Sequence, residues 1–280
     1  MRDNVIQRNT NTMKVQQKVF VVTGAGGGIG GALVADLLAR GAQVAAVDLR
    51  EESLHQLKEK LGASDNLSLH ALNISDRDAV AKLPGAVIAA HGRVDGLINC
   101  AGIVQPFVKV ADLDYDVIER VMNVNFYGTL YMSKAFLPHF LELPEAYLVN
   151  VSSMGGFLPV PGQSIYGASK AAVKLLTEAL YAELLDTNVH VTVVFPGATK
   201  TDITKNSGVA APTNATKGKK AKDFPMLAPS EAARIIVDGI EANKPQIFTG
   251  NDSKLMNRLY RLSPVRATKL ITKQMKSLLE

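Results

Sequence analysis

TGAGGGIG, residues 23–30, joins an apolar run, VFVVT (19–23), to a segment with helical patterning that begins at residue 28. Five of these eight residues are glycine, and glycine loses more conformational freedom on folding than any other residue. There is a chemical reason to place them here, because the start of a helix exposes unpaired N–H groups and the positive end of its dipole, which attract a pyrophosphate. After a first strand, the stretch favours a dinucleotide site, although a strand–helix turn can hold glycines without binding anything.

The rest of the chain alternates apolar runs of strand length with helix-length segments. Apolar strands separated by helices indicate a parallel sheet that is covered on both faces. The default topology for that order is a doubly wound, Rossmann-type α/β fold in a single domain. We expect strands at 19–23, 43–49, 67–72, 94–100, 147–152, 189–195 and 246–250, and helices at 28–40, 51–61, 75–91, 114–140, 165–186 and 230–242.

This pattern divides the chain into three parts. Residues 1–15 contain no apolar stretch and are expected to form a mobile N-terminal extension. Residues 16–250 form the Rossmann-type domain, in which a loop at about 200–228 follows the sixth strand and is expected to cover the substrate as a lid. Residues 251–280 form a basic, amphipathic helical tail.

The composition limits the classes of protein to consider. A chain of 280 residues with 47% hydrophobic and 20% charged residues can bury a large core without disulfides or metals. A single cysteine, Cys100, and the lack of a signal or transmembrane stretch suggest a cytoplasmic location. Residues 252–280 hold seven Lys or Arg and two acids, which accounts for the whole net charge of +5. The neutral body therefore does not indicate nucleic-acid binding, and the five histidines show no metal-ligand spacing.

Five more motifs follow the glycine turn in chain order: NCAG (99–102), VNFYGT (124–129), NVSSMGG (150–156), YGASK (166–170) and PGATKT (196–201). Together with TGAGGGIG they resemble the motifs of the classical short-chain dehydrogenases/reductases, over roughly residues 16–250. Two positions depart from the usual family pattern, with Cys100 replacing an alanine and Asn73 standing where Asp is more usual. The resemblance implies a nicotinamide cofactor held by Gly24, Gly28, Ile29, Gly30, Asp48, Asn73, Ile74, Asn99, Ala101, Gly102, Tyr166, Lys170, Pro196, Gly197 and Thr201.

The YGASK motif carries the candidate acid–base chemistry. Tyr166 and Lys170 are four residues apart on an expected helix and so share a face. A tyrosine is a poor base at neutral pH, and a neighbouring ammonium is expected to lower its pKa. A tuned Tyr166 can take a proton from an alcohol or donate one to a ketone. A surface pair at helical spacing would explain the same pattern without function.

The family resemblance adds two further catalytic residues. Ser153 would bond the substrate oxygen beside Tyr166, and the SS pattern and its distance from Tyr166 select it over Ser152. Asn125 would keep a water in a proton relay that leads to Lys170. Each has a simpler explanation, since a serine can cap the segment after a strand and an asparagine can bond the local backbone.

The end of the second strand bears on the choice of cofactor. Asp48 lies there, 18 residues after Gly30. An acid at that point can accept hydrogen bonds from the adenosine ribose and repels a 2′-phosphate, so NAD is expected rather than NADP. Arg50 is the one nearby residue that would favour NADP instead. Asp48 could also serve only to cap the following helix.

The uncharged stretch MGGFLPVPGQSI (154–165) corresponds to the family's substrate side. An apolar pocket that includes Met154, Phe157 and Leu158 would suit a lipophilic or alicyclic secondary alcohol. The alternative is that these residues pack the loop beneath the lid. The sequence does not identify the substrate or the direction of the reaction.

The tail holds apolar residues at helical spacing with basic residues on the other faces. We favour a helix packed on the enzyme body or across a subunit interface, and the alternative is an interfacial helix in weak contact with an anionic membrane. As in the family, the helices near 114–140 and 165–186 are expected to form a homodimer or homotetramer. The apolar residues are Leu255, Leu259, Leu262, Leu270, Ile271, Met275 and Leu278.

The sequence thus predicts an NAD-dependent oxidoreductase that interconverts a small-molecule secondary alcohol and its ketone. A non-catalytic protein that senses the cofactor on the same fold is one alternative, but it would not need all four of Asn125, Ser153, Tyr166 and Lys170. An NADP-dependent 3-oxoacyl or ketone reductase is another, and Asp48 counts against it. A sugar-nucleotide epimerase of the extended relatives would need a longer C-terminal substrate domain.

Overall fold

A computed structural model describes residues 15–62, 65–209 and 226–275. The predicted doubly wound fold is confirmed: seven parallel strands form one sheet in the order β3-β2-β1-β4-β5-β6-β7. The chain reverses its winding direction between β1 and β4, which pair through Phe20–Gly96, Val21–Leu97 and Val22–Ile98. The strands are β1 (Val19–Thr23), β2 (Gln43–Asp48), β3 (Leu67–Ala71), β4 (Gly96–Asn99), β5 (Ala146–Val151), β6 (Val189–Pro196) and β7 (Gln246–Thr249).

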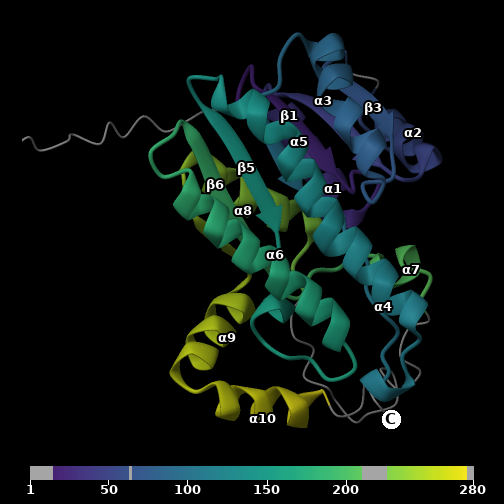
Figure 1. The fold of residues 1–280 in the computed structure, drawn as a ribbon, viewed down its shortest axis with the longest axis vertical. Coiled ribbons are helices and arrows are strands. Elements are labelled where there is room, and N and C mark those ends of the chain that lie inside the picture. The colour runs from purple at the N-terminus through teal and green to yellow at the C-terminus, as the bar shows by residue number, and fades with distance from the viewer. Residues whose placement is uncertain (1–14, 63–64, 210–225, 276–280) are drawn as a thin grey trace, which may run out of the picture.

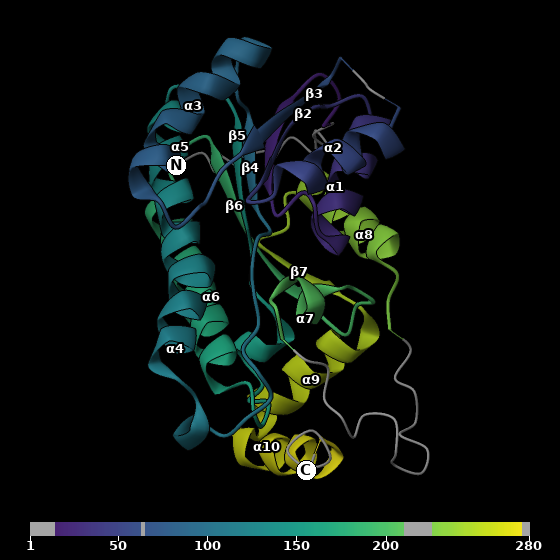
Figure 2. The same cartoon turned by 90° about the vertical axis from the view of Figure 1, so that its right-hand side faces the viewer.

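Helices cover both faces of the sheet, as Figure 2 shows with the sheet seen edge-on. Successive strand residues serve opposite faces, so Phe20 and Val22 enter one core cluster while Val19 and Val21 enter the other. The first face is covered by α1 (Gly28–Ala39), α2 (Glu51–Lys60) and α8 (Pro229–Glu241). The second is covered by α3 (Arg77–His91), α5 (Thr129–Leu141) and α6 (Ser164–Glu183).

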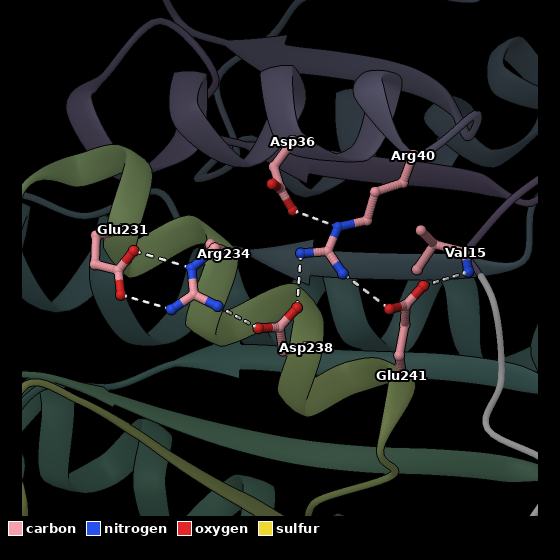
Figure 3. A network of polar contacts seen from close by, with 7 residues as sticks. All are labelled: Val15, Asp36, Arg40, Glu231, Arg234, Asp238 and Glu241. Atoms are coloured by element: carbon pink, nitrogen blue, oxygen red, sulfur yellow. Dashed lines mark hydrogen bonds and ion pairs between the residues drawn. The ribbon is translucent and has the colours of Figure 1, made fainter.

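An ion-pair network joins α1 to α8 on the first face (Figure 3). The guanidinium of Arg40, at the end of α1, donates to Asp36 at 2.8 Å, to Asp238 at 2.7 Å and to Glu241 at 2.8 Å. The second oxygen of Glu241 accepts the backbone N–H of Val15 at 3.1 Å. Since α1 begins at the glycine turn, this network holds the C-terminal end of the helix that carries that turn. Val15 is buried and therefore belongs to the body, while residues 1–14 of the expected extension lie outside the described residues.

The long helix expected near 114–140 contains a change of geometry. It comprises α4 (Tyr115–Met122), a π-helical segment (Asn123–Gly128) and α5. A π segment inside a helix is rare and occurs frequently at functional sites. Asn125 lies in this segment, between the two α-helical parts.

The remaining short and C-terminal elements gather near the carboxyl edge of the sheet (Figure 1). They are two 3₁₀ turns (Val110–Asp112 and Met154–Gly156), α7 (Ile203–Asn206), α9 (Asn251–Leu262) and α10 (Pro264–Gln274). Of the expected lid, residues 200–209 and 226–228 are described, and the two ends are tied by hydrogen bonds from Lys200 N to Leu227 O and from Leu227 N to Ala198 O. No helix in the described part of the chain is long and apolar enough to cross a bilayer.

Candidate active site

The glycine turn after β1 leaves no room for side chains. Gly24 has a φ of +70°, and a Cβ added there would lie 2.8 Å from the Cα of Ala101. A Cβ on Gly30 would lie 2.1 Å from the carbonyl oxygen of Gly24, inside the turn itself. A Cβ on Gly28 would lie 2.7 Å from the Cγ2 of Thr201, which therefore covers the turn from above. The glycines thus allow the backbone of the turn, the end of β4 and the loop after β6 to approach one another.

The start of α1 is free to bind an anion. Its N-cap is Gly27, and among the described residues no side chain caps the helix and no acid lies in its first turn. The first N–H groups of a helix and its positive dipole end are stabilised by a negative group. This arrangement fits the pyrophosphate of a dinucleotide.

A cavity of about 350 Å³ lies above the turn at the carboxyl ends of β1 and β4, the neighbouring strands between which the winding direction reverses. This crevice is where ligands bind in open doubly wound sheets. All but one of the fifteen residues expected to hold the cofactor line it, the exception being Asn99. The other lining residues are Gly27, Val47, Leu49, Arg50, Leu72, Cys100, Ile103, Val124, Val151, Ser152, Ser153, Thr199, Ile203 and Asn206.

Asn99 lies beneath the cavity. Its side chain is buried and donates to Asn150 at 2.8 Å and to Ser133 at 3.2 Å, which fixes the end of β4 against β5 and α5. Thr23 has a similar role on β1, where its hydroxyl accepts the N–H groups of Cys100 at 3.0 Å and of Ala101 at 3.1 Å. These bonds hold the two strand ends that form the floor of the cavity.

Asp48, the last residue of β2, also lines the cavity. Its Oδ2 accepts the N–H of Gly26 at 3.0 Å and its Oδ1 accepts the N–H of Arg50 at 3.1 Å. Each carboxylate oxygen has a second lone pair available for a further donor. Arg50 lines the same cavity, so an acidic and a basic residue occur together in its wall.

Ser153, Tyr166 and Lys170 come together in the cavity wall. The half-buried position of Tyr166 raises the pKa of its phenol, and a hydrogen bond with Ser153 opposes this effect. The sequence led us to expect a lowered pKa, and the direction differs because burial penalises the phenolate more than the hydrogen bond favours it.

Lys170 is 4% exposed, and its Nζ donates to the carbonyl oxygen of Val151 at 3.0 Å. Burial lowers its pKa to about 8, and the charge of a nearby Cys100 thiolate would act in the opposite direction. Burial likewise raises the pKa of the Cys100 thiol to about 11, so this cysteine stays protonated at neutral pH. Lys170 is thus a buried cation whose proton is lost far more easily than that of a surface lysine.

Asn125 does not line the cavity. Its side chain is fully buried, where Oδ1 accepts the N–H of Ile103 at 2.8 Å and Nδ2 donates to the Ile103 carbonyl at 2.9 Å and to Ser169 at 2.9 Å. A Cβ on Gly102 would lie 3.1 Å from the Nζ of Lys170 and 3.3 Å from the Oδ1 of Asn125, so both polar groups flank this glycine. Asn125 therefore holds the loop after β4 beside Lys170, and the water relay stays a prediction.

Two side chains that sequence reasoning missed support the site, one of them buried and the other partly exposed. Gln105 is fully buried, and its Oε1 accepts the backbone N–H groups of Ile165 at 2.7 Å and of Tyr166 at 3.1 Å. Asp252, in the first turn of α9, accepts the N–H of Ala198 at 2.8 Å and so fixes the turn that follows Pro196. Neither belongs to a recognisable motif, since each contact joins distant parts of the chain.

The three residues expected to form the substrate pocket do not line this cavity. Leu158 is fully buried in a cluster with Met256, Ala267 and Ile271 of the C-terminal helices. Met154 and Phe157 pack against the same cluster and do not line the cavity. In the structure, these residues join the body to α9 and α10, which resembles the alternative of loop packing.

No cluster of three or more His, Cys, Asp or Glu side chains suited to a metal ion occurs among the described residues. The parallel sheet, the uncapped helix after the glycine turn and the cavity at the switch point together define a Rossmann-type, dinucleotide-binding protein.

Comparison with known proteins gives the family. The model of the short chain dehydrogenase family matches residues 18–211. A putative oxidoreductase, SadH, of Mycobacterium tuberculosis is 36% identical over 252 residues, which are 88% of this chain and 90% of the relative. The 3-oxoacyl-[acyl-carrier-protein] reductase FabG of Thermotoga maritima is 35% identical over 196 residues, which are 69% of this chain and 78% of the relative. The chain belongs to the classical short-chain dehydrogenase/reductase family of oxidoreductases.

Solved structures share the fold. A short-chain dehydrogenase/reductase from Burkholderia phymatum in complex with NAD superposes with a TM-score of 0.80 at 24% identity, covering 91% of this chain and 96% of that one. A short chain dehydrogenase from Burkholderia cenocepacia in complex with NADP gives 0.77 at 25% identity, covering 92% and 99%. One of these neighbours was solved with NAD and the other with NADP.

Proposed function

We propose that this protein is an NAD-dependent oxidoreductase that interconverts a secondary alcohol and its ketone. The observation that carries the proposal is the meeting of Ser153, Tyr166 and Lys170 in the same cavity as the uncapped start of α1. The reaction needs two things: side chains that exchange a proton with the substrate oxygen, and a binding site for the pyrophosphate of the cofactor.

The cavity suits the cofactor in its shape and its polar groups. The turn from Gly24 to Gly30 would hold the pyrophosphate, because added Cβ atoms would fill the space and the helix start lacks a cap. Asp48, Asn73 and Ile74 would hold the adenosine half, and the wall from Pro196 to Thr201 would cover the nicotinamide half. When bound, the nicotinamide accepts or supplies the hydride.

The protein's own residues handle the proton. The pKa of Tyr166 is raised, so the phenol keeps its proton at neutral pH and can donate it to a ketone oxygen. Ser153, which is hydrogen-bonded with Tyr166, would hold the same oxygen. Lys170 would stabilise the phenolate that forms and contact the ribose. We therefore expect ketone reduction to be favoured at neutral pH and alcohol oxidation to rise as the solution becomes alkaline.

The preference for NAD rests on Asp48. Its two oxygens already bind the backbone at Gly26 and Arg50, which fixes the carboxylate at the ribose end of the cavity. A fixed negative charge there would accept ribose hydroxyls and repel a 2′-phosphate.

A screen of secondary alcohols and ketones, followed by NADH fluorescence, tests the proposal. The set should include alicyclic and other lipophilic compounds, because Ile103, Val151 and Ile203 line the cavity. We expect turnover by the wild type and loss of turnover by Tyr166→Phe, with NADH binding retained in both. Tyr260→Phe, which changes a tyrosine on α9 (Asn251–Leu262) outside the cavity, is the matched control and should keep full activity.

A protein that binds NADH but reduces no compound in the set, with Tyr166→Phe indistinguishable from wild type, would instead support the cofactor-sensing alternative. A 3-oxoacyl reductase that uses NADPH is the second candidate, and the similarity to FabG favours it. Acetoacetyl thioesters offered with NADPH and with NADH distinguish this candidate, because Asp48 predicts the faster rate with NADH.

We also propose that the protein acts as a homodimer or homotetramer. Large apolar side chains are exposed along α4 to α6 and their connections, as the family interface requires: Tyr115, Tyr127, Leu141, Leu175, Tyr181 and Leu185. Analytical ultracentrifugation tests this, and a monomer at micromolar concentration would contradict it.

A further inference from the structure

The two C-terminal helices, α9 and α10, have apolar residues on two sides. One set faces the body, where Met256, Ala267 and Ile271 pack against Leu158. This contact explains why the helices are held on the molecule. It does not explain a second set that faces outward: Leu255 is 53% exposed, Leu262 83%, Val265 65% and Leu270 40%.

The two most exposed of these residues lie at the corner between the helices. Leu262 ends α9, Ser263 forms the connection, and Val265 lies in the first turn of α10. Figure 1 shows this corner projecting at the lower left edge of the molecule, away from the sheet. A projecting apolar corner cannot enclose a small-molecule ligand, but its side chains can insert into the surface of a lipid bilayer.

The charge around the corner has a single sign. Residues 253–275 contain six Lys or Arg and no Asp or Glu. All six are exposed, and none forms an ion pair with another described residue: Lys254, Arg258, Arg261, Arg266, Lys269 and Lys273. A surface that combines exposed aliphatic side chains with unopposed positive charge matches the interface of an anionic bilayer.

The other exposed apolar region differs in this respect. The helices α4 to α6 also expose leucines and tyrosines, but there acids such as Glu119 and Glu183 occur together with bases such as Arg120 and Lys134. A negative membrane surface would repel those acids. The charged residues therefore distinguish the two regions. The outer side of α9 and α10 suits an anionic bilayer, whereas the α4 to α6 region suits another copy of the chain.

We propose that the outer side of α9 and α10 is a docking surface for an anionic lipid bilayer. The side chains of Leu262 and Val265 enter the boundary between headgroups and acyl chains, and Arg261 and Arg266 beside them bind lipid phosphates. The protein binds reversibly, since a few aliphatic side chains and a basic patch give weak attachment. This surface is separate from the cavity and acts whether or not the proposed reaction is correct.

Flotation of the full-length protein with vesicles tests the proposal. Phosphatidylcholine vesicles with about 30 mol % phosphatidylglycerol are compared with pure phosphatidylcholine, at low salt and at about 0.5 M NaCl. We expect binding to the anionic vesicles, at least about tenfold weaker binding to neutral ones, and loss of binding at high salt.

Two variants separate the apolar and charged contributions. Leu262→Gln with Val265→Gln, and Arg261→Gln with Arg266→Gln, should each weaken binding by about tenfold or more. The matched controls are Val110→Gln, which removes a side chain that is 58% exposed, and Lys58→Gln with Lys60→Gln on α2. The controls should bind as the wild type does, and thermal melting verifies that each variant is folded.

Three results would overturn the proposal. The first is the absence of binding to anionic vesicles by the folded wild type. The second is equal binding by the wild type and the Leu262→Gln, Val265→Gln variant. The third is a change of sedimentation coefficient in that variant without any vesicle binding by the wild type, which would make the surface an interface between copies of the chain.

Discussion

The buried amide of Gln105 accepts the backbone N–H of Tyr166 at 3.1 Å, and the same oxygen accepts the N–H of Ile165 at 2.7 Å. Its Nε2 donates to the carbonyl of Gly162 at 3.0 Å. A side chain from the loop after β4 therefore caps the first turn of α6 and the segment before it. Through this cap, the loop after β4 fixes the start of the helix that carries Tyr166.

Gln105→Leu tests this positioning role. Loss of the acceptor leaves two partly buried N–H groups unpaired, so we expect the free energy of unfolding to fall by about 2 kcal/mol. We also expect kcat to fall by about tenfold while the Kd for NADH changes little, because misplacement of a reacting group affects the chemical step. Steady-state kinetics, NADH fluorescence titration and urea unfolding measure the three quantities.

Gln105→Glu is the informative companion. The carboxylate keeps the acceptor at the helix start, where negative charge is favourable, but its second oxygen faces and repels the carbonyl oxygen of Gly162. Partial recovery of kcat relative to Gln105→Leu would support positioning. A Gln105→Leu enzyme that loses stability but keeps the wild-type kcat would show that the residue is merely structural.

The fold was largely predictable because its signals are local. Apolar strands alternate with helices, and a glycine turn after the first strand allows only a few topologies. The exact ends of elements differed by up to three residues, as for the fourth strand, which was expected at 94–100 and spans Gly96–Asn99. The π segment at Asn123–Gly128 was not foreseen, since helical periodicity does not distinguish it from an ordinary helix.

The site was predictable only where its residues form short motifs. Gln105 and Asp252 were missed because their partners lie 61 and 54 residues away along the chain. Met154, Phe157 and Leu158 are next to a motif, yet their packing depends on C-terminal helices that lie outside it. Burial decides whether the pKa of Tyr166 is raised or lowered, and no sequence motif reveals burial. The cytoplasmic location, the oligomer and the catalytic roles stay predictions.

Asp252→Ala tests the link between α9 and the loop after β6. Asp252 accepts the N–H of Ala198, and a Cβ on Gly197 would lie 2.3 Å from its Oδ1, so the carboxylate and the turn are in close contact. Without this acceptor we expect the turn to loosen and the KM for the cofactor to rise by about tenfold, with a smaller change in kcat. Asp252→Asn keeps an acceptor and is expected to stay close to the wild type. Equal kinetics for Asp252→Ala and wild type would contradict the link.

Asp48→Asn tests the proposed cofactor preference. The change removes the negative charge but keeps an oxygen that can accept the N–H of Gly26. With Arg50 in the same cavity, we expect the ratio of kcat/KM for NADP to that for NAD to rise by at least about tenfold, because the repulsion of a 2′-phosphate is gone. Arg50→Gln should move the ratio in the opposite direction. An unchanged ratio in both variants would place the discrimination elsewhere.

Lys170 makes a prediction about stability that does not require activity. Burial lowers its pKa from the ordinary 10.5 to about 8, so between these values the unfolded chain binds the proton and the folded chain does not. The free energy of unfolding therefore rises with pH across this window, and the full cost of burying the cation remains below pH 8.

Lys170→Met removes this titration, so the comparison with wild type isolates it. We expect the stability of the wild type relative to Lys170→Met to increase by about 2 kcal/mol between about pH 8 and 10, measured by urea unfolding at several pH values. Lys174→Met, one turn further along α6, makes the same chemical change at a partly exposed position and controls for the loss of a lysine side chain. Parallel pH profiles for wild type and Lys170→Met would mean that Lys170 keeps an ordinary affinity for its proton, and the buried-cation account of the site would then be wrong.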